Sequence, residues 1–113
     1  MGSFKEMKET DIQATICEYL QLKMNQNKLL FWRANTTSVY DPTRKVFRSM
    51  PKYALKGVAD IIVIKDGFAI FLEIKKKGTY QSKEQKEFER LAKLNGSEYY
   101  VIRDLDEVIE IGL

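Results

Sequence analysis

Residues 57–77, with the sequence GVADIIVIKDGFAIFLEIKKK, decide the fold that we expect for this chain. Asp66-Gly67 at its centre is typical of a tight two-residue turn between antiparallel strands. The flanking runs, 59–64 and 68–74, are almost continuously apolar, as expected of strands that are covered on both faces. The stretch therefore predicts a buried β-hairpin.

The turn also sets which residues face each other across this hairpin. A two-residue loop pairs Lys65 with Phe68, and the same register puts Asp60 opposite Glu73 on one face of the sheet. Lys75 lies two residues further on and shares that face. Two opposed carboxylates with Cβ atoms about 5 Å apart repel each other. A divalent cation offsets this repulsion, and oxygen-rich carboxylate sites suit magnesium or manganese.

A plainer explanation places both acids at the exposed end of the sheet, with Glu73 in a salt bridge to Lys75. We favour the metal site, because that salt bridge does not explain why Asp60 faces the other two residues. Charged side chains are seldom buried unless they are paired or bound to metal.

Composition limits the chemistry. The 113 residues predict a single domain over 1–113, with no histidine and one cysteine. Absence of histidine excludes Ser-His-Asp and Cys-His catalysis and histidine metal sites, so any reaction depends on carboxylates, lysines and a metal. The lone cysteine fits a reducing compartment, and no run is apolar enough to span a membrane. We expect a cytoplasmic location in a phage or bacterial cell.

Basic residues concentrate in one segment. Residues 28–56 carry seven lysines and arginines and one acid, so this segment has a net charge of +6 and the rest of the chain −3. Aromatic residues alternate with these cations, which suits a nucleic acid. A solvated surface above some core aromatics explains the pattern about equally well.

The other predicted elements complete an α/β domain. Before the central hairpin come a helix over 8–24, with Glu9 and Asp11 in its first turn, and a strand from Leu29. A loop or hairpin over 36–53 follows, with a turn at 41–43 and a return strand at 45–48. After the central hairpin come a helix from Ser82 to Asn95-Gly96, a strand over 99–102 and a short helix capped by Asp104. This order favours three layers around a mixed sheet. The strand at 99 and the strand that ends near Lys77 are expected to be parallel neighbours.

The acidic pair and its surroundings resemble a known family. Asp60 followed by Glu73-Ile74-Lys75 is similar to the Asp…Glu-x-Lys signature of the PD-(D/E)xK nuclease superfamily. Over nearly the whole chain, the pattern resembles the VRR-NUC (virus-type replication-repair nuclease) domain. The matching segments are ETDIQ at 9–13, GVAD at 57–60, EIK at 73–75 and SKEQ at 82–85. Ala59 stands where the superfamily nominally has proline. The resemblance implies a three-layer, restriction-endonuclease-like fold.

The resemblance also implies a role for each matching residue. Mg²⁺ or Mn²⁺ would be bound by Asp60, Glu73, the backbone carbonyl of Ile74 and, directly or through water, Glu9. Lys75 would position or deprotonate the attacking water and stabilise the charge that develops on the phosphate. Gln85 would orient Lys75 or the metal-bound water.

Some of these roles have alternatives. Glu9 also fits a surface acid that complements the helix dipole, and Gln85 fits a capping-box partner of Ser82. Because two carboxylates favour the charged form of Lys75, electrostatic stabilisation is its safer role. Further contacts to phosphates are expected from four lysines, Lys76, Lys77, Lys83 and Lys86, which also fit a solvated face.

We therefore expect a metal-dependent DNA endonuclease that acts in DNA repair on branched DNA, such as four-way (Holliday) junctions. The small chain and the two symmetric cuts that a junction needs favour a homodimer, with residues 29–32 or the terminal helix as candidate interfaces. The alternative is a catalytically silent nucleic-acid-binding module with a nuclease fold. A sequence-specific restriction-type nuclease is a third possibility, with little room for base-reading elements beyond 36–53.

Overall fold

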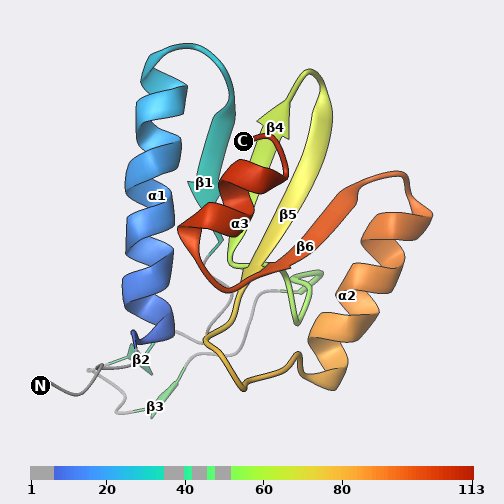
Figure 1. Cartoon of the computed structure of the whole chain (residues 1–113). Coiled ribbons are helices and arrows are strands. Elements are labelled where there is room, and N and C mark those ends of the chain that lie inside the picture. The colour runs from blue at the N-terminus through green and yellow to red at the C-terminus, as the bar shows by residue number, and fades with distance from the viewer. Residues whose placement is uncertain (1–6, 35–39, 42–45, 48–51) are drawn as a thin grey trace, which may run out of the picture.

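The computed structural model describes residues 7–34, 40–41, 46–47 and 52–113. Its elements follow the predicted order: α1 (Glu9–Asn25), β1 (Leu30–Arg33), β2 (Tyr40–Asp41), β3 (Val46–Phe47), β4 (Ile61–Lys65), β5 (Phe68–Ile74), α2 (Lys83–Leu94), β6 (Glu98–Ile102) and α3 (Leu105–Glu110). Figure 1 shows them along the chain.

The central sheet is mixed, as predicted. Its strand order is β1-β4-β5-β6, with β1 and β5 antiparallel to β4, and β6 parallel to β5. The hairpin register is confirmed from Lys65 opposite Phe68 to Ile61 opposite Leu72. Asp66 and Gly67 both have positive φ, 52° and 83°, as a primed two-residue turn requires. The predicted parallel neighbours, β5 and β6, are also confirmed.

Helices cover both faces of this sheet (Figure 1). Helices α1 and α3 pack on one face, where apolar residues of α1 meet every second residue of β4 and β5; the buried cluster contains Ile12, Ile16, Leu20, Leu29, Ile61, Val63, Ile70, Leu72, Ile74, Ile102, Val108 and Leu113. Helix α2 packs on the other face, where the Phe88 ring meets Phe71 edge-on at 4.9 Å between centroids and Tyr99 at 6.1 Å. Alternation along β5 puts Glu73 on the α2 face.

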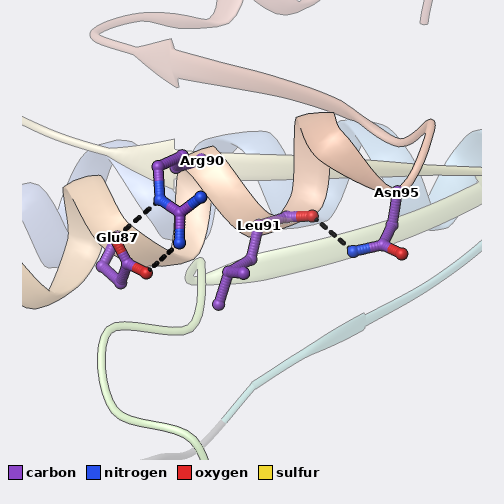
Figure 2. A network of polar contacts seen from close by, with 4 residues as sticks. All are labelled: Glu87, Arg90, Leu91 and Asn95. Carbon is purple, nitrogen blue, oxygen red and sulfur yellow. Dashed lines mark hydrogen bonds and ion pairs between the residues drawn. The ribbon is translucent and has the colours of Figure 1, made fainter.

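Helix α2 begins and ends as the sequence predicts. The Ser82 side chain accepts from the Gln85 N–H, and the Gln85 side chain accepts from the Ser82 N–H, which is a complete capping box. Toward the other end of the helix, Arg90 forms an ion pair with Glu87, and the Asn95 amide donates to the Leu91 carbonyl (Figure 2). These contacts fix the helix that supplies Gln85.

Two predictions differ in detail from the structure, and a third is confirmed in part. The first helix begins and ends one residue later than predicted, and the strand expected over 59–64 is observed as Ile61–Lys65. The pairing of β2 with β3 confirms a hairpin inside 36–53, whereas residues 42–45, which include most of the predicted turn, lie outside the described residues. No helix in the described ranges is long and apolar enough to cross a membrane.

Candidate active site

Asp60 and Glu73 lie opposite each other at the end of the hairpin. Asp60 precedes β4 by one residue, just beyond the last paired residues, Ile61 and Leu72, and it is close enough to Glu73 to raise the pKa of that acid. A continuing ladder would pair the Ile74 N–H with the Ala59 carbonyl. This N–H instead donates to Asp60 Oδ2 at 2.7 Å. The regular strand therefore starts at Ile61, later than predicted, because the Asp60 carboxylate replaces a backbone acceptor.

Glu73 is buried in an unusual state for a carboxylate. Glu73 is only 1% exposed, and its Oε1 accepts a hydrogen bond from Gln85 Nε2 at 2.8 Å. Its second oxygen, Oε2, is buried and has no hydrogen-bond partner among the described residues. Burial, and after it the neighbouring Asp60, raises the pKa of Glu73 from 4.5 to about 8, while Lys75 acts in the opposite direction. Among the described residues, Glu73 forms no ion pair that would neutralise its charge.

Gln85 is the capping-box partner of Ser82, one of the roles considered from the sequence, and its other contact is with Glu73 rather than with Lys75. Its Oε1 accepts from the Ser82 backbone N–H at 2.8 Å, and its Nε2 donates to Glu73 at 2.8 Å. One amide therefore caps α2 and holds the buried carboxylate. The start of the helix and the orientation of Glu73 are fixed by the same side chain.

Glu9 and Lys75 lie at the same end of the sheet. Glu9 Oε1 accepts from the Lys76 N–H at 3.3 Å and from the Thr79 hydroxyl at 3.1 Å, which ties the first turn of α1 to the loop after β5. Its charge is among the effects that raise the pKa of Glu73. The Lys75 N–H donates to the Ile102 carbonyl at 3.0 Å, so the β5–β6 pairing extends to this lysine.

The residues present suit a divalent cation, with Asp60 and Glu73 as the candidate ligands. The donors are carboxylate oxygens, which magnesium and manganese prefer, and the unpartnered Glu73 Oε2 is an available acceptor. A third acid does not complete the cluster: no group of three or more His, Cys, Asp or Glu side chains within the described part of the chain is arranged to hold a metal. Glu9 and the Ile74 carbonyl therefore stay predicted ligands.

Gly57 is a site residue that the sequence reasoning did not single out by itself. It has a φ of +75°, and a Cβ built there would lie 2.3 Å from the Glu84 carbonyl oxygen and 2.7 Å from the Gln85 nitrogen. The loop before β4 therefore touches the first turn of α2, backbone to backbone. An isolated glycine ahead of a strand is a weak signal for such an approach.

Comparisons with known proteins support the fold. No protein-family model and no curated protein match this sequence. A solved structure described as "VRR_NUC domain" matches 87% of this chain and 90% of its own, with 19% identity and a TM-score of 0.55. Another, "VRR_NUC domain protein", matches 95% of this chain and 86% of its own, with 21% identity and a TM-score of 0.56. The predicted fold, a mixed sheet flanked by helices as in VRR-NUC domains, is confirmed.

Proposed function

We propose that this chain is a VRR-NUC nuclease: a metal-dependent endonuclease that hydrolyses phosphodiester bonds in branched DNA. The observation that carries the proposal is the buried pair of Asp60 and Glu73, with one oxygen of Glu73 lacking a partner in the described residues. The fold shared with VRR-NUC domain structures supports it. A buried acidic pair adds nothing to a module that only binds polyanionic DNA, because it repels the ligand.

The chemistry follows from the two kinds of charged group in this site, the carboxylates and the lysine. A Mg²⁺ or Mn²⁺ ion held by Asp60 and Glu73 supplies charge neutralisation at the phosphate and a more acidic water. Lys75, on the same face of the sheet, stabilises the charge that develops on the phosphate oxygens and positions the attacking water. Gln85 keeps the Glu73 carboxylate in place through its 2.8 Å hydrogen bond.

Branched DNA and a homodimer belong to the proposal as its finer part. A chain of 113 residues offers little surface for a whole junction, and two symmetric cuts require two active sites. On the exposed edge strand β1, Leu30 and Trp32 are 52% and 46% exposed, which supports this strand as the contact between protomers. The basic residues of segment 28–56 then contact the DNA arms.

Cleavage of a substrate panel tests the proposal. End-labelled four-way junction, flap, single-stranded and linear duplex DNA are incubated with Mg²⁺, Mn²⁺ or EDTA, with wild-type protein, Asp60→Ala and Lys75→Ala. We expect metal-dependent cuts that both substitutions abolish, and paired symmetric cuts in the junction. If folded wild-type protein binds these DNAs but cuts none with either metal, the chain is a binding module instead.

Substitutions at Gln85 and Ser82 separate helix capping from a role in the site. Ser82→Ala removes the cap oxygen that accepts at 3.2 Å and is expected to lower stability by about 1 kcal/mol with cleavage largely kept. Gln85→Ala also removes the amide that donates to Glu73. We expect it to reduce cleavage by at least about tenfold beyond Ser82→Ala. Equal cleavage by the two variants, measured below both unfolding transitions, would show that Gln85 only caps the helix.

A further inference from the structure

A pocket lies beside the acidic pair on the α2 face of the sheet. It has a volume of about 270 Å³ and five lining residues: Tyr80, Gln81, Lys86, Val101 and Arg103. Three elements contribute them, namely the loop after β5, helix α2 and the end of β6. No local sequence pattern connects these residues, because only the fold brings them together.

The sheet register places this pocket next to the reacting centre. Val101 in β6 is the direct partner of Glu73 in β5, and adjacent strands lie about 4.8 Å apart. The pairing continues beyond the strands, since the Lys75 N–H donates to the Ile102 carbonyl. Arg103 is therefore the neighbour of Lys75, one strand further from Asp60. A chain of phosphates that crosses the site in this direction meets the pocket next.

The pocket carries two positive side chains. Arg103 Nη1 donates to the Lys76 carbonyl at 2.7 Å, which orients the guanidinium and leaves its other N–H donors available for an anion. Lys86 approaches from α2. Neither side chain forms an ion pair with another described residue, in contrast to Arg90 and Lys93 on the same helix. Their charges are thus not neutralised within the described part of the protein.

The walls of the pocket are held in place. Gln81 Nε2 donates both to Glu89 Oε1 and to the Tyr99 hydroxyl, each at 3.0 Å. Tyr80 is 77% exposed, and the Arg103 guanidinium lies 5.6 Å from the centroid of its ring. An exposed aromatic ring beside a cation is the combination on which nucleic-acid bases stack.

We infer that this pocket binds the phosphate next to the scissile one on the same DNA strand. Arg103 and Lys86 contact that phosphate, and the Tyr80 ring supports the adjoining base. The inference rests on the proposed function, because it assigns the strand that crosses Asp60 and Glu73. In this arrangement Arg103, Lys86 and Tyr80 are positioning residues, because they set where the DNA lies relative to the metal site.

Binding measurements test the pocket without cleavage. Fluorescence anisotropy with labelled single-stranded and four-way junction DNA, in EDTA, compares wild-type protein with Arg103→Gln, Lys86→Gln and Tyr80→Leu. Arg90→Gln is the matched control, since it removes one charge from α2 outside the pocket. We expect Arg103→Gln and Lys86→Gln to weaken binding about tenfold and to lower the salt-dependence slope by about one. Arg90→Gln should leave the affinity and the slope unchanged. Tyr80→Leu should weaken binding of single-stranded DNA more than binding of the four-way junction.

Lys86→Gln guards against a misleading result, because Arg103 also holds the loop after β5 through the Lys76 carbonyl. If Arg103→Gln lowers the melting temperature, the comparison rests on Lys86→Gln, because the Lys86 ammonium forms no ion pair with the described residues. Binding by Lys86→Gln and Tyr80→Leu that equals that of Arg90→Gln overturns the inference. Cleavage by wild-type protein is scored separately, so the nuclease proposal stands or fails independently of the pocket.

Discussion

Replacing Glu73 with glutamine is expected to abolish DNA cleavage and, in the same protein, to raise the free energy of unfolding at pH 8. Cleavage should fall by about a thousandfold, because Glu73 is a proposed metal ligand and such a ligand supplies several kcal/mol of transition-state stabilisation. Stability should rise because glutamine keeps an acceptor for Gln85 while it removes a charge that is buried beside Asp60. Loss of activity would thus accompany a gain in stability.

The pH dependence of stability tests the electrostatic part of this prediction. The pKa of Glu73 is raised from 4.5 to about 8 in the folded protein, so the folded state binds more protons than the unfolded state between these values. Stability without metal should therefore fall as the pH rises through this window. At about 1.4 kcal/mol per pKa unit, we expect Glu73→Gln to regain at least ~2 kcal/mol at pH 8.

Urea unfolding at pH 5 and pH 8, with and without Mn²⁺, measures both effects. The metal should stabilise wild-type protein and have little effect on Glu73→Gln. Glu87→Gln is the matched control, because it makes the same change at an exposed acid whose pKa is lowered by Arg90. A Glu73→Gln protein that is less stable than wild type at pH 8 would contradict the buried repulsion that we describe.

The Gly57→Ala substitution is expected to destabilise the protein and to reduce cleavage together. A Cβ at this position would lie 2.3 Å from the Glu84 carbonyl oxygen and 2.4 Å from its carbon, so backbone must move on one side. The positive φ adds about 1–2 kcal/mol of strain for any residue with a Cβ. Since the displaced segment is the start of α2, Gln85 loses its position beside Glu73.

Gly67→Ala provides the control for conformational strain. Gly67 also has a positive φ, +83°, but a Cβ there meets nothing within 4 Å. Gly67→Ala should lower the free energy of unfolding by about 1 kcal/mol and leave cleavage unchanged. Gly57→Ala should lower it by at least about 3 kcal/mol. Urea midpoints and cleavage rates at a temperature where each variant is folded measure the difference. Equal losses for the two alanine variants would show that contact with α2 is unimportant.

The sequence predicted the part of the site that depends on local geometry. A two-residue turn fixes the hairpin register, so the closeness of Asp60 and Glu73 beyond its last pair followed from Asp66-Gly67. The capping box likewise predicted the start of α2, and with it the helix turn that carries Gln85. These features depend on residues close together in the sequence.

The rest of the site depends on contacts between distant segments, which no local pattern encodes. Glu9 meets Thr79 across 70 positions of the sequence, Gly57 meets the backbone of α2, and Arg103 lines a pocket with Tyr80. Each contact requires the layers to be packed first. The hydrogen bond that ends β4 early was missed for a similar reason, since a side chain there takes the place of a backbone acceptor.

The tight turn between β4 and β5 also bears on how the protein folds. Closing a two-residue loop costs far less chain entropy than joining α1 to the loop after β5, a contact that spans 67 positions. The hairpin is therefore expected to form early in folding, while its two carboxylates are still hydrated and their repulsion is weak in water. Docking of α2 is the step that removes this water from Glu73. We therefore expect pH and divalent ions to change the rate of α2 docking rather than the rate of hairpin closure.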